Sequence, residues 1–397
     1  MSQTDILSTI AQITGVGPKH WQPFDEKSPG GVPMTGYVCL QESDYLGALA
    51  LTAIGGKERF EIIPSMPKIH YPYVEDPREG TVRVVVPLPI NIVDVRFTTK
   101  IDGTCIIFYA LPDDAQAGNP LEIIPRTRLN PVLTASRWGD WPAMLKQVLP
   151  DRSGVERAVR DQKLVLAFEL WGYRNPHLVR YDTPLALSFH TAIRRSAGHL
   201  ASFRTLQDLA GRYGFDLVKS IRIEKPDAQA LESAYRALQQ QMEARNQAAG
   251  EGIFIEEGAV LMVSTRDTAT YYKCKPPSIE EIHFAADQAL GKEIIRQALL
   301  KLAERNYDFA NGNAADLSAE LEKDFPAPVV EGQAELIQRT WVDFVIELQK
   351  RDWLKQLVEQ SGLDPHQQTV ELMRHLSQHY PKSQMKWVYS SVKAIYG

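Results

Sequence analysis

The stretch FTTKIDGTCIIFY, residues 97–109, places a lysine two residues before an Asp-Gly pair and between two apolar runs. Taken alone, it fits a surface hairpin, in which strand, turn and strand account for the lysine, the aspartate and the glycine. The other interpretation is a functional lysine at the end of a strand, beside a turn that leads away from it. Four residues are too few to choose between the two, so the rest of the chain must decide.

The composition is that of a soluble globular protein of two or three domains. The chain has 397 residues, of which 44% are hydrophobic and 23% charged. Its net charge of −5 gives no overall basic field, so a nucleic-acid partner would need a local basic groove. No apolar run approaches the length of a membrane span, and we expect no membrane partner.

Cysteine usage and the N-terminal sequence indicate the compartment. The three cysteines, Cys39, Cys105 and Cys274, are far apart and show no metal-type spacing, which suits a reducing environment. The first residues lack the basic region and apolar core of a signal peptide. We therefore expect a cytoplasmic protein.

The spacing of apolar residues changes at Pro276-Pro277. Before it, short apolar runs separated by Pro and Gly predict strands, with helices over residues 4–14, 138–148, 201–214 and 227–250. After it, apolar residues recur at three- and four-residue steps, which predicts helices only. We expect these helices around residues 336–348, 353–360, 368–379 and 383–396. The predicted class is α+β, with a mixed domain over 1–277 and a helical domain over 278–397.

Five strand-associated stretches place polar residues inside apolar runs. They are KIDG (100–103), PRTR (125–128), FELWG (168–172), EGIFI (251–255) and KCK (273–275). A buried charge is costly unless it is paired. Glu169 and Glu251 would meet that requirement if they faced Lys100, Lys273 and Lys275 across one cleft.

Such a cleft suits a nucleotide. Lysine and arginine bind phosphate oxygens, and carboxylates beside them suit Mg²⁺. A lysine whose pKa is lowered by burial and by cationic neighbours can act as a nucleophile. Its attack on an α-phosphate would give a lysyl–nucleotide and release pyrophosphate, with the cations stabilising the charge that develops.

The order KxDG, Arg, FELxG, EGI and KxK resembles the covalent nucleotidyltransferases, which are the ATP-dependent RNA and DNA ligases and the mRNA capping enzymes. The spacing is most similar to that of phage-type RNA ligases, and the resemblance covers residues 97–275. It implies a core of antiparallel, ATP-grasp-like sheets. It also implies that ATP is the nucleotide and that Mg²⁺, or Mn²⁺ in its place, is the metal.

The resemblance also implies roles for residues of the nucleotide site. Lys100 corresponds to the nucleophile that accepts AMP, with Asp102 and Gly103 completing its motif. Arg128, or else Arg126, corresponds to the arginine that contacts a phosphate.

Four further correspondences follow from the later motifs. Glu169 corresponds to the carboxylate that holds the ribose, and Phe189, in LALSFHTAI, to the aromatic that stacks on adenine; ordinary core packing is the alternative for Phe189. Glu251 corresponds to the metal-linked carboxylate. Lys273 and Lys275 correspond to the pair that grips the α-phosphate.

Two departures from the motifs leave the base preference between ATP and GTP open. Thr99 precedes the lysine where several RNA ligases carry Glu, and His190 follows Phe189 where ligases frequently have an acidic residue.

The C-terminal region favours one branch of the superfamily. DNA ligases and capping enzymes follow the core with an oligonucleotide-binding β-barrel, which needs several short strands. Because helices are predicted here, we expect an RNA ligase that joins 5′-phosphate and 3′-hydroxyl ends through lysyl-AMP and RNA-adenylate. The alternatives are a DNA ligase, a capping-type enzyme and a catalytically inactive module that binds RNA ends.

Overall fold

The computed structural model describes residues 3–76, 81–84, 91–111, 122–135, 139–175, 177, 179–224, 227–250, 255–279, 290–325, 330 and 333–396. The chain divides into two compact units. The first consists of Met1–Thr134, Pro142–Trp171 and Ala186–Pro276. The second has its main segment over Pro277–Gly397, and two earlier segments, Ala135–Trp141 and Gly172–Leu185, which the sequence did not indicate, are grouped with it.

The first unit begins with helix α1 (Gln3–Thr14) and a four-stranded antiparallel sheet. Its strands, in chain and spatial order, are β1 (Trp21–Lys27), β2 (Pro33–Cys39), β3 (Leu49–Ile54) and β4 (Lys57–Ile63). Gly55 and Gly56 join the last two strands with φ of 61° and 78°, the left-handed conformation that two-residue hairpin turns require. Ile10 of α1 packs with Trp21 and Tyr37 of the sheet in one apolar cluster.

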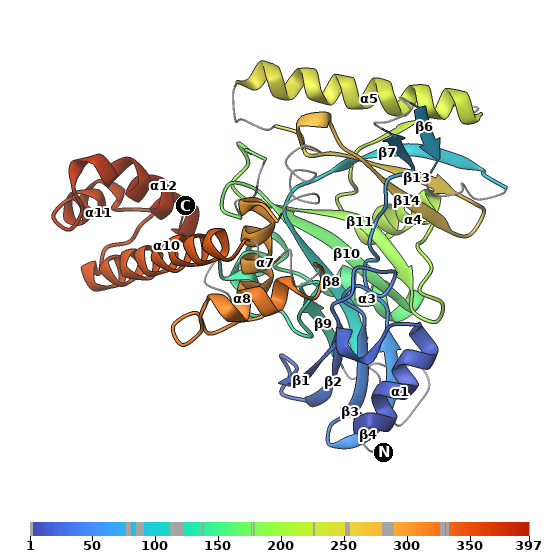
Figure 1. The fold of residues 1–397 in the computed structure, drawn as a ribbon, viewed down its shortest axis with the longest axis horizontal. Helices are drawn as coiled ribbons and strands as arrows, with labels where there is room; N and C mark the ends of the chain where they lie inside the picture. Colours follow the sequence, from blue (N-terminus) through green and yellow to red (C-terminus); the bar gives the residue numbers. More distant parts are fainter. Residues whose placement is uncertain are drawn as a thin grey trace. The chain divides into compact units, whose positions relative to one another are not determined.

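Two further antiparallel sheets form the centre of this unit (Figure 1). One has the spatial order β11 (Ala186–Arg194), β10 (Leu164–Trp171), β8 (Thr104–Leu111) and β9 (Glu122–Arg126). The other has the order β12 (Ser220–Arg222), β7 (Asp94–Lys100), β13 (Gly258–Ser264) and β14 (Ala269–Cys274). A short separate pair consists of β5 (Tyr73–Asp76) and β6 (Thr81–Val84).

The stretch that opens the sequence is not a hairpin. Lys100 is the last residue of β7 and Thr104 the first of β8, and these strands belong to different sheets. The intervening residues 101–103 therefore cross from one central sheet to the other. This crossing explains why a lysine at a strand end lies beside residues of both sheets.

Helices cover these sheets. They are α2 (Trp141–Val148), α3 (Ser153–Gln162), α4 (Phe203–Tyr213) and α5 (Ala228–Ala249). The side chain of Asp227 caps α5 by accepting a hydrogen bond from the Ala230 amide at 2.7 Å. From the same helix Tyr235 donates to the carbonyl of Lys273 at 2.8 Å, and Gln239 donates to that of Lys275 at 2.8 Å. Helix α5 thus holds the backbone of the KCK motif in place.

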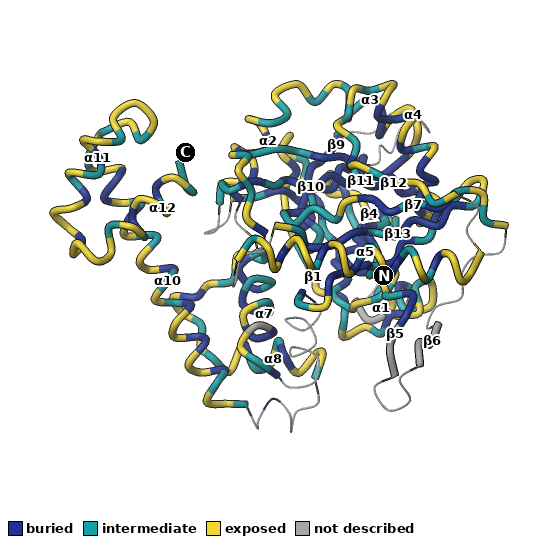
Figure 2. Tube along the Cα trace, turned by 90° about the horizontal axis from the view of Figure 1, so that it is seen from above, coloured by how far each residue is buried: buried dark blue, intermediate teal, exposed yellow. Residues whose placement is uncertain are grey.

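The burial pattern agrees with this layered arrangement. Figure 2 shows buried residues running along the strands of the two central sheets, with exposed residues concentrated on the outer faces of the helices. Strand β8 is almost wholly buried, which accounts for its continuous apolar sequence CIIFYAL.

The second unit is helical throughout the described part of Pro277–Gly397. Its helices are α7 (Lys292–Glu304), α8 (Ala314–Leu321), α10 (Ala334–Ser361), α11 (Thr369–Leu376) and α12 (Met385–Tyr396). Helix α10 joins two predicted helices into one, because no Gly or Pro interrupts residues 334–361. Its first half packs with α7 and α8, and its second half with α11 and α12. The predicted α+β class with helices at the C-terminal end is confirmed.

None of the helices that the structure describes combines the length and the apolar character needed to cross a bilayer.

Gly103 is expected to be required where the chain crosses between the sheets. A Cβ at this position would lie 2.3 Å from the carbonyl oxygen of Leu170, and this backbone atom cannot move aside without disturbing β10. Gly103→Ala should therefore destabilise the fold by about 2 kcal/mol, which urea denaturation measures. As a control, Gly211→Ala in α4 meets no atom within 4 Å and should stabilise by about 0.5–1 kcal/mol. Equal stability of Gly103→Ala and the parent would contradict this account of the crossing.

Candidate active site

A pocket of about 100 Å³ lies where residues of the two central sheets meet. Its wall includes five residues that the sequence analysis singled out for a site or for the base preference, which are Thr99, Lys100, Arg128, Glu169 and His190. Apolar side chains, among them Ile69, Val218 and Val260, complete it. The structure thus brings together side chains that are widely separated in the sequence.

Three charged side chains form a chain of ion pairs at one side of the site. Glu257 pairs with Lys100 through one carboxylate oxygen and with Lys275 through the other, at 2.8 Å. Strand pairing produces this arrangement, because Gly258 lies opposite Lys100 and Ala259 lies opposite Cys274. Only 7% of the Glu257 side chain and 5% of that of Lys275 are exposed, so these charges depend on one another rather than on water.

The ion pairs set the protonation states of their members. Burial by itself would raise the pKa of Glu257, but the charges of Lys100 and Lys275 lower it to about 2. Burial by itself would lower the pKa of Lys100, but the charge and hydrogen bond of Glu257 outweigh this and raise it. Burial lowers the pKa of Lys275, and Glu257 offsets this only in part. Lys100 is consequently an ammonium group when no ligand is bound.

Lys273 has a different environment from Lys275, although both lie on the same face of the strand. Its Nζ lies 5.5 Å from the centre of the Tyr71 ring. Burial, followed by the charges of Lys68, Lys275 and Lys100, lowers the pKa of Lys273 to about 7. An anion placed here would favour the charged form, which makes this lysine a candidate contact for a phosphate group.

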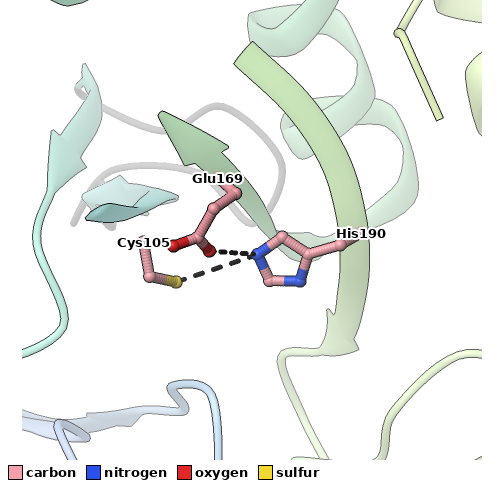
Figure 3. Close-up of side chains that lie close together, drawn as sticks. All are labelled: Cys105, Glu169 and His190. Carbon is pink, nitrogen blue, oxygen red and sulfur yellow. Dashed lines mark hydrogen bonds and ion pairs between the residues drawn. The ribbon is translucent and has the colours of Figure 1, made fainter. Parts of the chain in front are cut away.

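The opposite wall carries Cys105, Glu169 and His190 on the neighbouring strands β8, β10 and β11 (Figure 3). Burial raises the pKa of Glu169 to about 8. Burial, with the positive charges of Arg128 and Lys100, lowers that of His190 to about 3. The contact of 3.5 Å between His190 Nε2 and Glu169 Oε2 therefore joins two groups that are mainly uncharged at neutral pH.

The two candidate arginines have different positions. Arg126 is fully buried, donates to the carbonyl of Arg128 at 2.8 Å and lies 5.7 Å from the centre of the Tyr109 ring. Burial lowers its pKa to about 10. Arg126 thus stabilises the backbone after β9 by a hydrogen bond, whereas Arg128 lines the pocket.

The position of Phe189 does not support the expected stacking on a base. The residue is fully buried, and its ring packs against Phe168 and Phe215 at centroid distances of 5.1 and 5.2 Å. A bulge between Ala167 and Phe168 leaves His190 without a partner in the strand register. It is His190, next in the chain, that lines the pocket, while Phe189 lies in the core.

The carboxylate expected at Glu251 falls outside the described residues, and Glu257 was not among the expectations. A signal for Glu257 did exist, because the Glu-Gly pair recurs at 257–258, directly before the apolar run AVLMV. Among the other expected residues, Asp102 contributes charge that raises the pKa of Lys100, and Gly103 approaches β10 closely.

The free energy of unfolding should depend strongly on pH in the acid range, because the charge of Glu257 stabilises the fold. Because its pKa is about 2 in the fold and 4.5 as a free side chain, the ionised form adds about 3 kcal/mol of stability. This contribution is complete above about pH 4.5 and is lost as the pH falls through 2. Glu257→Gln should therefore lower the free energy of unfolding at pH 7 by about 3 kcal/mol and flatten its dependence between pH 4.5 and 2.

Glu256→Gln provides the matched control, because the partly exposed pair of Glu256 with Arg245 contributes less than about 1 kcal/mol. Denaturant titrations of the three proteins across this pH range measure the difference. Parallel pH profiles of Glu257→Gln and the parent would show that the ion pairs do not stabilise the fold.

Comparison with known proteins gives matches among solved structures only. No family model and no curated protein matches the chain. The chain is similar to an archaeal ATP-dependent RNA ligase, with a TM-score of 0.46, 16% identity and coverage of 94% of this chain and 90% of that one. It is also similar to a protein of Aquifex aeolicus described as a "putative ATP-dependent DNA ligase" (TM-score 0.44, 13% identity, coverage 94% and 88%).

A third similar structure is the Naegleria gruberi RNA ligase with PPi, with a TM-score of 0.33, 9% identity and coverage of 67% of this chain and 98% of that one. At these identities and scores, the activity of the present chain has to be inferred from its own residues.

Proposed function

We propose that the chain is an ATP-dependent polynucleotide ligase that acts on RNA and forms a covalent lysyl-AMP intermediate on Lys100. The observation that supports this most strongly is the position of Lys100 at a strand end, in the wall of the pocket and in an ion-pair chain with Glu257 and Lys275. A nucleophile, cationic side chains for phosphates and two carboxylates are thereby brought together from separate parts of the chain. This combination meets the chemical requirements of adenylyl transfer.

The pocket suits the nucleoside part of ATP. Apolar side chains such as Val260 and Val218 provide surfaces for a flat base, and Glu169 offers a carboxyl group to the ribose hydroxyls. A carboxyl group with a pKa near 8 can both donate and accept hydrogen bonds at neutral pH. His190, in its neutral form, has its Nδ1 hydrogen-bonded to Thr191 and offers Nε2 to the base or the sugar.

The phosphates are assigned to the cationic side of the site. Lys273 and Lys275 lie on one face of β14 and the residue after it, and Arg128 lines the pocket. Glu257 is ionised at neutral pH and supplies the hard oxygen ligands that Mg²⁺ prefers, so it fits such an ion. A Mg²⁺ or Mn²⁺ ion held by Glu257 and phosphate oxygens would stabilise the negative charge that develops on the transferring group.

Lys100 must lose a proton before it can attack. The negative charge of Glu257 raises the pKa of Lys100, and a cation bound by Glu257 would weaken this interaction, so that Lys100 could release its proton to solvent. The neutral Nζ then forms a bond to the α-phosphorus as the bond to the bridging oxygen breaks and pyrophosphate leaves. In the following steps the AMP passes to a 5′-phosphate, and a 3′-hydroxyl displaces it to form the new phosphodiester.

RNA is favoured over DNA as the substrate by the helical second unit. In the described part of the chain after Cys274 no strand occurs, whereas an oligonucleotide-binding β-barrel would need several. The alternative activity is the joining of DNA ends by the same chemical steps.

Incubation with α-labelled ATP and Mg²⁺ should label the protein covalently through Lys100. The label should survive SDS and be released by acid, as expected of a phosphoramidate. Lys100→Ala should abolish labelling, whereas Lys146→Ala, on the exposed face of α2, should label like the parent. Full labelling of Lys100→Ala would disprove this assignment of the nucleophile. GTP in place of ATP tests the base preference.

Joining assays on the same preparations test the nucleic acid. Nicked and single-stranded RNA with 5′-phosphate and 3′-hydroxyl ends should be sealed faster than nicked DNA. A preference for nicked DNA would assign the chain to DNA joining, and labelling without joining of either would leave adenylyl transfer as its activity.

Substitution of each candidate carboxylate should show which one serves the metal. Glu257→Gln should lower the rate of adenylylation by about 10² or more at saturating Mg²⁺, because an electrostatic stabiliser of the transition state is lost. Glu251→Gln, at the carboxylate that the resemblance links to the metal, is compared in the same assay. Rates must be normalised to folded protein, since Glu257 also stabilises the fold. The reverse result would assign the metal-linked role to Glu251.

A further inference from the structure

Three different metal-ligating groups meet in the wall of the pocket. The Sγ of Cys105, a carboxylate oxygen of Glu169 and a ring nitrogen of His190 all lie within 4.8 Å of one another. Figure 3 shows the thiol and the carboxylate turned towards the same nitrogen, Nε2. The distances from this atom are 3.9 Å to the sulfur and 3.5 Å to the nearer carboxylate oxygen.

The sheet itself produces this convergence. Cys105 and Glu169 are directly opposite each other in the pairing of β8 with β10. On the other side of β10, the bulge between Ala167 and Phe168 leaves His190 out of the regular pairing with β11. The three ligands therefore come from three adjacent strands, which are rigid supports for a metal site.

The two separations from Nε2 are close to those of tetrahedral coordination. Zinc binds thiolate sulfur at about 2.3 Å and nitrogen or oxygen at about 2.0–2.2 Å, which places tetrahedral ligands about 3.4–3.6 Å apart. The measured 3.5 and 3.9 Å require a movement of only a few tenths of an ångström.

His190 is also held in an orientation suitable for a ligand. Its other ring nitrogen, Nδ1, lies 2.8 Å from the hydroxyl of Thr191, which is fully buried. When Nδ1–H donates to this hydroxyl, Nε2 carries a free lone pair directed at Cys105 and Glu169. Ligating histidines in metal sites are oriented by hydrogen bonds of this kind.

Charge balance favours a divalent ion at this position. A thiolate, a carboxylate and a neutral imidazole together balance a charge of +2. The ion would thus add no net charge beside Lys100 and Arg128. A sulfur and nitrogen donor set favours Zn²⁺ over Mg²⁺, which prefers oxygen ligands alone.

We propose that Cys105, Glu169 and His190 bind Zn²⁺ as three protein ligands, with the fourth coordination position open to the pocket. This site is distinct from that of the hard cation assigned to Glu257. It further follows, if Glu169 holds the ribose as in the proposed function, that Zn²⁺ and ATP compete for the pocket. Zinc would then be a reversible inhibitor of adenylylation.

Titration of the metal-free, reduced full-length protein with Co²⁺ tests the site without reference to any activity. Cobalt replaces zinc in sulfur-containing sites and gives a sulfur-to-cobalt charge-transfer band, which added Zn²⁺ should remove. Cys105→Ser should abolish the band, and His190→Gln should weaken Co²⁺ binding by about 10-fold or more. Cys39→Ala and His199→Gln, which change a thiol and an imidazole outside the cluster, should bind like the parent.

The outcomes separate this proposal from the proposed function. Absence of the band in the parent, or an unchanged band in folded Cys105→Ser, would overturn the metal site whether or not Lys100 is adenylylated. Circular dichroism establishes that each variant is folded. If Co²⁺ binds with equal affinity in the presence and absence of saturating ATP, the competition is disproved while the metal site stands.

Discussion

The buried carboxylate of Glu257 is the constraint on which the site depends. It pairs with both Lys100 and Lys275, and removal of one partner from such an arrangement typically costs about 3–5 kcal/mol. The arrangement also fixes a strand register, since a slip of one residue in β13 would turn Glu257 away from both lysines. Fold and site are therefore specified together. The central sheets supply the geometry, and the ion pairs disfavour alternative pairings.

The same interaction explains why the site retains so much charge. Replacing a buried ion pair by apolar residues is often neutral or stabilising, so stability alone gives little reason to keep two lysines around one carboxylate. An anionic ligand gives a reason. Lys273, whose pKa is near 7 without ligand, would gain charge beside a phosphate, and Glu257 raises the pKa of Lys100 and so keeps it protonated in the free protein. Charge that is costly in the free protein is thus stored for use on binding.

The sequence was sufficient for the parts of the fold and site that local patterns specify. The α+β class, the helical region after Pro277 and the positions of Lys100, Glu169 and Arg128 at one pocket follow from strand and helix periodicity and from the motifs. What the sequence did not reveal depends on register. Alternation along the strand does not reveal the bulge that leaves Phe189 in the core and His190 at the pocket. The Glu-Gly pairs at 251 and 257 look alike locally, and only the pairing with Lys100 distinguishes the second.

The two carboxyl groups of the site, those of Glu257 and Glu169, have opposite protonation states. Glu257 is ionised at neutral pH, whereas Glu169 is mainly protonated because burial outweighs its attraction to Lys100. Because their environments separate the two pKa values, the ionised carboxylate can bind a hard cation, whereas the protonated carboxyl group can donate a hydrogen bond. Lys100 couples the walls, since its charge lowers the pKa of both Glu169 and His190. In the proposed function, loss of that charge on adenylylation of Lys100 would raise both pKa values, and the protonated Glu169 would then be a better hydrogen-bond donor to the ribose.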